Sequence, residues 1–196
     1  GRTKENNLLE SRVRLWVLDQ VKPGNRPSVL FNPSTLPELK EHIQSKDGGK
    51  RWSRIISAAK RARKQSLPTD QLFEYPIEYL LQERGGHSDV TRGLARDIFF
   101  NALLYAVEGN EEAGQFAKQG LLFQANMKQW IHPSFANQGH FSYLYVGQTA
   151  YYCGITYDLI HDLLTPEQRR IARKGILEKG IEAGFEHSFV NNAVPS

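Results

Sequence analysis

Apolar and polar residues alternate along most of the chain with the period of an α-helix. Residues 52–59 show the pattern clearly, since Trp52, Ile55, Ile56 and Ala59 fall on one stripe of a helix. Only residues 28–31 read as a short extended segment, bounded by two prolines. The pattern therefore predicts an all-α protein. The expected helices cover about residues 37–45, 50–65, 89–108, 111–130, 141–164 and 166–188.

The segment between the last two predicted helices carries the strongest turn signal in the chain. Thr165 is a good N-cap, Pro166 suits the first helical position, and Gln168 has the spacing of a capping box. Gly109-Asn110 predicts a second tight break. Helices joined by such short turns pack nearly antiparallel, so we expect an array of antiparallel helical hairpins: a solenoid, a bundle or an α/α toroid. The absence of a repeat of fixed period weighs against tetratricopeptide-like or ankyrin-like solenoids.

Three weaker boundary signals lie earlier in the chain. Thr35 and Glu38 have capping-box spacing, which predicts a helix start near residue 35. Gly48-Gly49 predicts the end of that helix. Residues 66–88 contain two prolines, a glycine pair and several aromatic residues, which is typical of a long functional loop.

The net charge of +4 has a local origin. Residues 50–64 hold seven basic residues and no acidic one, and Arg54, Arg61 and Lys64 lie off the apolar stripe of that predicted helix. Such an excess attracts nucleic acid, anionic lipid or acidic polysaccharide, and charge alone does not choose among them. It is equally typical of a solvated helix face.

Several classes of chemistry have no motif in this sequence. The six histidines and Cys153 show no metal-ligand spacing, and no glycine-rich phosphate loop is present, so we expect neither a metal nor a cofactor. Cys153 is predicted to fill the core. No apolar run is long enough to span a membrane, and the first residues lack the apolar core of a signal peptide, which is therefore absent or already removed.

Residues 135–157 combine aromatic and polar side chains. Tyrosine offers a flat apolar face and a hydroxyl, which suits the C–H faces and hydroxyls of a sugar, although tyrosines of a buried helix look the same in sequence. Asn191 and Asn192 follow the last predicted helix, where asparagine often ends a helix and where it could also contact a substrate. The candidate binding residues are Gln138, His140, Tyr143, Tyr145, Gln148 and Asn191.

Four segments, in order, resemble the heparinase II/III-like polysaccharide lyases. Residues 26–39 are similar to the entry segment of that family, with Arg26-Pro27-Ser28 in place of the usual His-Pro-Arg. The Trp52-x-x-Ile-x-x-Ala pattern and residues 101–113 are similar to the next two segments. Residues 156–169 resemble the helix-turn-helix that is most typical of the family. The similarity spans about residues 26–188.

The resemblance implies a fold, a reaction and a location. Residues 1–25 would be an N-terminal arm, and residues 26–196 the N-terminal portion of an incomplete α/α toroid. The family cleaves uronic-acid polymers, alginate or glycosaminoglycans, by β-elimination, in the periplasm or outside the cell. A neutralising group screens the C6 carboxylate, a base removes the C5 proton and an acid protonates the leaving O4. The implied partner is an anionic polysaccharide, with neither nucleic acid nor membrane.

The resemblance stops short of the catalytic segment. The family carries an Asn-Asn-Trp or Asn-His sequence there, and Asn192 is the candidate catalytic residue, although Ala193-Val194-Pro195 is not the usual continuation. The family's catalytic tyrosine and a β-sandwich domain come later, so the expected partners include a C-terminal remainder of the same chain. One alternative is a non-enzymatic helical module that binds an anionic partner through residues 50–64. Another is a structural scaffold.

We expect residues 1–196 alone to show no lyase activity, because this sequence does not match the family's catalytic segment. The assay is the ultraviolet absorbance of unsaturated uronate ends after incubation with alginate, heparin or hyaluronan. Measurable product formation would contradict this expectation.

Overall fold

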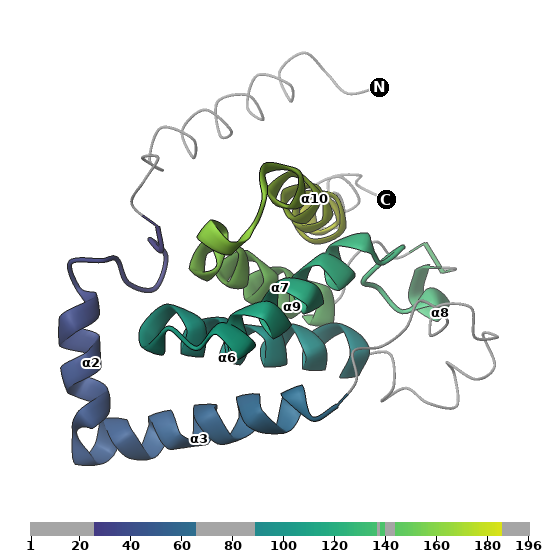
Figure 1. Ribbon diagram of the computed structural model, residues 1–196. Coiled ribbons are helices and arrows are strands. Elements are labelled where there is room, and N and C mark those ends of the chain that lie inside the picture. The colour runs from purple at the N-terminus through teal and green to yellow at the C-terminus, as the bar shows by residue number, and fades with distance from the viewer. Residues whose placement is uncertain (1–25, 66–88, 137, 140–143, 186–196) are drawn as a thin grey trace.

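The computed structural model describes residues 26–65, 89–136, 138–139 and 144–185, and all regular secondary structure in them is helical (Figure 1). The all-α prediction is confirmed for this part of the chain. The predicted arm (1–25) and the predicted loop (66–88) lie outside the described residues. The elements are α2 (Leu36–Gln44), α3 (Lys46–Arg63), the π-helical turn η2 (Asp89–Gly93), α6 (Leu94–Glu108), α7 (Glu111–Asn126), α8 (Pro133–Ala136), α9 (Leu144–Leu159), the 3₁₀ turn η3 (His161–Leu163), α10 (Pro166–Ile176), the π-helical stretch η4 (Leu177–Glu182) and α11 (Ala183–Phe185).

Both predicted tight turns are confirmed. Gly109 ends α6 in the left-handed conformation, with φ of 72°, and the Asn110 side chain caps α7 by accepting a hydrogen bond from the backbone N–H of Ala113 at 2.9 Å. At the start of α10, the Gln168 N–H donates to Thr165 Oγ1 at 3.2 Å, and the Thr165 N–H donates to Gln168 Oε1 at 3.0 Å. This reciprocal pair is the complete capping box expected from the sequence.

The helices on either side of each turn run antiparallel. The Gly114 backbone, at the start of α7, packs against the Tyr105 ring near the end of α6. At the other end of this hairpin, Gln124 Nε2 donates to the carbonyl of Thr91 at 2.9 Å, just before α6. In the second hairpin, Gly180 of η4, which continues α10, packs against Ala150 in the first half of α9.

The two hairpins stack side by side in the same orientation. Arg92, just before α6, lies 4.6 Å from the Tyr145 ring in the first turn of α9. Seven residues later on both helices, Phe99 and Tyr152 have ring centroids 5.4 Å apart, so α6 and α9 run parallel. Since α7 and α10 run antiparallel to these helices, they are also parallel to each other, and Gly175 of α10 packs directly on the Ala125 backbone near the end of α7. Glycine is required at position 175 because a Cβ atom there would lie 2.6 Å from Ala125 Cα. The result is one pair of parallel helices backed by a second pair.

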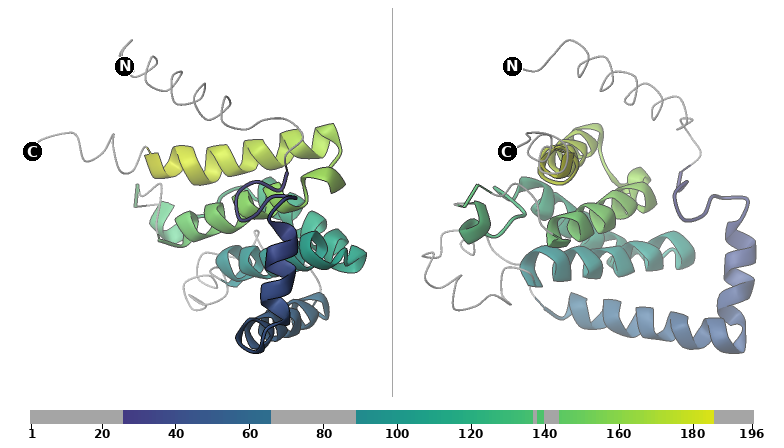
Figure 2. Two further views of the ribbon diagram at one scale, coloured as in Figure 1. Left: turned by 90° about the vertical axis from the view of Figure 1, so that its left-hand side faces the viewer. Right: turned by 180° about the vertical axis from the view of Figure 1, so that it is seen from behind.

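Helix α3 covers α6 at the edge of this array, on the side opposite α10 (Figures 1 and 2). Arg63 Nη1 donates to Asn101 Oδ1 at 2.6 Å, and Asn101 Nδ2 donates to the carbonyl of Ala59 at 3.4 Å. Near the other end of α3, Trp52 Nε1 donates to Glu108 Oε1 at 2.6 Å. These contacts fix which face of α3 meets the array.

The boundary between α2 and α3 differs from the prediction. The break lies at Ser45, whose hydroxyl caps α3 by accepting a hydrogen bond from the Gly48 N–H at 3.1 Å. Gly48 and Gly49 therefore belong to the first turn of α3 and do not end the preceding helix. Gly48 is needed there because a Cβ atom would collide with the carbonyl oxygen of His42.

The capping box expected for α2 is also wrong. Thr35 is the N-cap residue, but its side chain makes no capping hydrogen bond. Asn32 organises this turn, because its Oδ1 accepts hydrogen bonds from the N–H groups of Ser34 at 2.9 Å and Thr35 at 3.1 Å. An asparagine side chain competes well for backbone N–H groups in a turn.

A buried carboxylate ties the segment before α2 to α9. Asp158 Oδ1 accepts hydrogen bonds from Arg26 Nη1 at 2.8 Å and Ser28 Oγ at 3.1 Å, and its Oδ2 accepts from the N–H groups of Ser28 at 2.6 Å and Val29 at 2.9 Å. The Asp158 side chain is 2% exposed, so these partners replace its water. Residues 28–31, expected to be extended, form no strand, and bends lie at residues 29 and 30.

The apolar core lies between the two hairpins and includes Ile98, Leu121, Trp130 and Ile160. Trp130 was expected within a helix, but α7 ends at Asn126, and Trp130 folds back so that its Nε1 donates to the Gln124 carbonyl at 2.9 Å. Cys153 is fully buried, as predicted, and burial raises the pKa of its thiol far above the ordinary range.

Gly175→Ala is expected to lower the free energy of unfolding by about 2 kcal/mol, because the added methyl group meets the Ala125 backbone. Gly154→Ala in α9 is the matched control. Apart from the backbone of its own helix, no described atom lies within 4 Å of the position that its Cβ would take, so it should stabilise the helix by about 0.5 to 1 kcal/mol. Urea unfolding followed by circular dichroism measures both, and equal midpoints for the two variants would contradict this packing.

Asp158→Asn is expected to cost about 3 kcal/mol, because the buried amide that replaces the carboxylate would turn an NH₂ group toward one of the donors of Arg26, Ser28 and Val29. Asp162→Asn, at an exposed position one helical turn further, should stay within about 0.5 kcal/mol of wild type. The measurement is again the urea midpoint, and an undiminished midpoint for Asp158→Asn would disprove the anchoring role.

Candidate functional site

An arginine and a tyrosine meet where the first turns of α6 and α9 come together. The guanidinium carbon of Arg92, in η2, lies 4.6 Å from the centroid of the Tyr145 ring, in the first turn of α9. The contact follows from the parallel packing of α6 and α9, which brings both N-terminal ends to one end of the array. The cation is attracted to the face of the ring, and this contact leaves the guanidinium N–H donors available.

The Arg92 charge is not neutralised by the part of the chain that the structure describes. Its guanidinium donates no hydrogen bond and forms no ion pair there, whereas the neighbouring Arg96 lies 3.5 Å from Asp97. A guanidinium fork without a partner matches the two oxygens of a carboxylate. Arg92 is therefore a candidate anion-binding residue.

Gln148 lies one helical turn after Tyr145 and so on the same side of α9. Its amide oxygen is buried and accepts no hydrogen bond from the described residues, while the residue as a whole is partly exposed. The hydroxyl of Thr156 also lacks a partner among them, but that residue is fully enclosed. An unpaired buried acceptor is unfavourable, so a hydroxyl donor that reached the Gln148 oxygen would gain a hydrogen bond.

An open strip of α9 adjoins these residues. Leu144 and Tyr151 are 67% and 58% exposed, and no described atoms lie within 4 Å of a Cβ position at Gly147 or Gly154. The Tyr151 ring stands edge-on to Tyr152, with centroids 5.4 Å apart. A flat ligand can therefore reach an exposed tyrosine face and the helix backbone beside it.

Arg92 lies inside one helical stretch that η2 and α6 form together, since Gly93 between them has helical backbone angles. The site thus combines the positive charge of Arg92, an exposed aromatic ring and a buried acceptor.

The structure brings together two of the residues predicted from the sequence, Tyr145 and Gln148. Gln138 is exposed in the turn after α8, where its N–H donates to the Phe135 carbonyl at 3.1 Å and its side chain makes no hydrogen bond with described residues. The other four candidates, His140, Tyr143, Asn191 and Asn192, lie outside the described residues.

Sequence reasoning missed Arg92. It belongs to no motif, and its contact with Tyr145 depends on how two separate hairpins pack. In sequence it is one of two basic residues in the helix predicted over residues 89–108, and nothing there distinguishes it.

Lys179 illustrates a titratable group with a structural role. Its Nζ donates to the Ala125 carbonyl at 2.7 Å, close to the C-terminal end of α7, and partial burial lowers its pKa. A cation is favourable at that end of a helix. We therefore assign Lys179 to the packing of α7 against η4.

Neither a metal centre nor a membrane span is found among the described residues. No three of their His, Cys, Asp and Glu side chains form a group that could hold a metal ion. None of their helices has both the length and the hydropathy that a bilayer span requires.

No protein-family model matches this chain, and no curated protein matches it. The chemistry of the site therefore rests on its geometry. That geometry suits a ligand with a carboxylate, an apolar face and hydroxyl groups.

Proposed function

We propose that this chain is part of a polysaccharide lyase and that Arg92, Tyr145 and Gln148 bind one uronate unit of its substrate. The observation that carries the proposal is the Arg92 guanidinium, stacked on Tyr145 without a carboxylate partner among the described residues and one turn from the unpaired amide oxygen of Gln148. A uronate presents a carboxylate and several hydroxyls on one rigid ring, which matches both groups.

Each group has a defined role in this proposal. Arg92 pairs with the C6 carboxylate through two N–H donors, and Gln148 accepts a hydrogen bond from a ring hydroxyl. The exposed face of Tyr151 supports the C–H face of a neighbouring sugar. In β-elimination the C5 proton becomes acidic only when the carboxylate charge is screened, and an arginine at that carboxylate supplies the screening.

The fold is compatible with this proposal. Two hairpins stacked in the same orientation, with parallel helices in each layer, are a unit from which an α/α toroid can be built. The entry segment at Arg26–Val29 and the hairpin at Thr165, both similar to segments of the heparinase II/III-like lyases, belong to one packed body through Asp158. An extracellular polysaccharide would place the protein in the periplasm or outside the cell.

The test is binding of a uronate tetrasaccharide, measured by titration calorimetry, with the carboxyl-reduced tetrasaccharide as a neutral comparison. The intact chain should bind the charged sugar and not the reduced one. Arg92→Gln should weaken binding by about 10- to 100-fold, because a charge-assisted pair is lost. Gln148→Met, which keeps the shape but removes the acceptor, should weaken it about 5-fold.

Arg96→Gln is the control, because it removes an exposed charge one turn from Arg92 but belongs to a pair with Asp97. It should leave the affinity within about 2-fold of wild type. Equal binding of the reduced sugar, or equal losses for Arg92→Gln and Arg96→Gln, would contradict a uronate site at Arg92.

A further inference from the structure

Helix α3 carries a straight row of basic residues on its outer face. Lys50, Arg54, Arg61 and Lys64 follow one another at intervals of four, seven and three residues, which places them on one stripe of a helix. Lys50, Arg54, Arg61 and the Ser57 between them are exposed, and Lys64 follows at the C-cap of the helix. At the rise of an α-helix, the row extends for about 21 Å.

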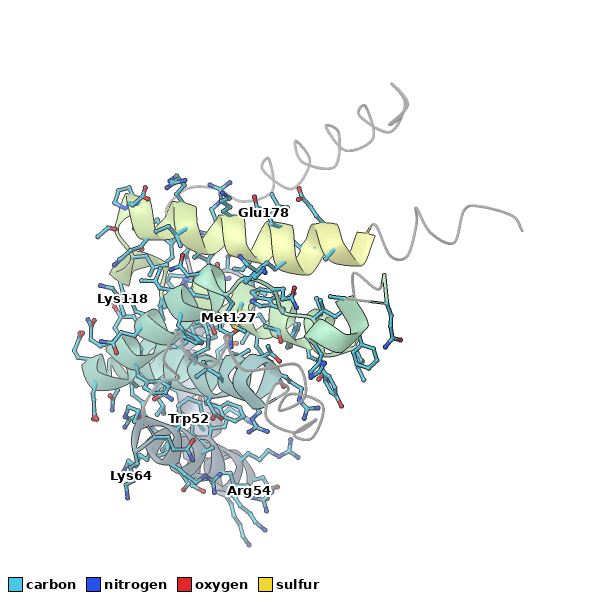
Figure 3. The ribbon with its side chains drawn as sticks, turned by 90° about the vertical axis from the view of Figure 1, so that its right-hand side faces the viewer. Trp52, Arg54, Lys64, Lys118, Met127 and Glu178 are labelled. Atoms are coloured by element: carbon cyan, nitrogen blue, oxygen red, sulfur yellow. The ribbon has the colours of Figure 1, made fainter. Side chains whose placement is uncertain are left out.

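The contacts of the opposite face fix the direction of the row. Trp52 packs against the array and donates to Glu108, and Ala59 is fully buried against α6. In Figure 3, Trp52 lies on the side of α3 that faces the other helices, and Arg54 and Lys64 lie on the far side. The row therefore points away from the helical array.

The charges of the row are not compensated within the described residues. None of Lys50, Arg54, Arg61 and Lys64 forms a side-chain hydrogen bond or an ion pair there. Arg63, the basic residue of α3 that turns inward, is held by Asn101 and lies 3.4 Å from Glu112. Like charges one turn apart repel each other, so the row is unfavourable for the isolated helix. An anionic ligand would remove that repulsion.

We propose that this row is a second binding surface, along which an extended stretch of anionic polysaccharide docks. The inference rests on the proposed function, since it assigns to the row the same polymer that the Arg92 site binds. A linear polyuronate presents carboxylates at regular intervals and so meets a linear row of cations. By holding the polymer, the row raises its concentration near the site.

The composition of this face favours a polysaccharide over a nucleic acid. Surfaces that bind single strands interleave basic residues with aromatic side chains on which bases stack. Trp52, the aromatic residue of α3, is turned toward the array, and Ser57 separates the two halves of the row. No sequence motif of a groove-binding helix accompanies the row.

The test compares two variants with the same loss of charge. The row variant is Lys50→Gln, Arg54→Gln, Arg61→Gln and Lys64→Gln. The control is Lys40→Gln, Lys128→Gln, Arg173→Gln and Lys174→Gln, at exposed positions on other parts of the surface. Circular dichroism verifies that both fold. Affinity is then measured for long alginate or heparin chains, for a DNA duplex and for the tetrasaccharides used above, over a range of salt concentrations.

The row variant should bind the polymer about 10-fold more weakly than wild type, with a shallower dependence on salt, and should bind the tetrasaccharide unchanged. Unchanged polymer affinity in the row variant, or an equal loss in the control, would contradict the proposal that the row binds the polymer. So would a variant that keeps polymer binding but loses binding to a DNA duplex, since this outcome would assign the row to nucleic acid. Failure of the wild-type chain to bind any tetrasaccharide would instead contradict the Arg92 site.

Discussion

The close contact between the two hairpins sets the register on which the other features depend. Gly175 of the second hairpin lies on the Ala125 backbone of the first, so α10 approaches α7 without an intervening side chain. Packing of this kind tolerates almost no sliding, because a shift by one residue would place a Cβ atom in the contact. The same register aligns α6 with α9 and so brings Arg92 over Tyr145, from segments far apart in the chain.

Local signals made much of the fold predictable. The turns at Gly109 and Thr165 were predicted because their capping groups lie within three residues of one another. The prediction for the start of α3 is wrong, because two close contacts place the glycine pair inside the helix. The Ser45 hydroxyl caps α3, and the His42 carbonyl lies so close to Gly48 that only glycine fits there. Tyr145 and Gln148 could be selected from composition alone. Arg92 could not, because it joins them only through tertiary packing.

The two basic features of the molecule differ in ways that suit different roles. Arg92 is a single cation held in one orientation by an aromatic ring, beside a buried acceptor, which suits recognition of one sugar unit. The row on α3 consists of long side chains spread along the outer face of one helix, which suits many weak contacts with a polymer. Recognition and retention of a polyanion would thus occupy separate surfaces, with α3 fixed to α6 through Asn101.

The most direct measurement is a crystal structure of this chain with a bound uronate tetrasaccharide. Our account predicts a sugar carboxylate within about 3 Å of the Arg92 guanidinium nitrogens and a sugar hydroxyl at a similar distance from the amide oxygen of Gln148. A sugar bound elsewhere, with Arg92 paired to a carboxylate of the protein itself, would contradict it.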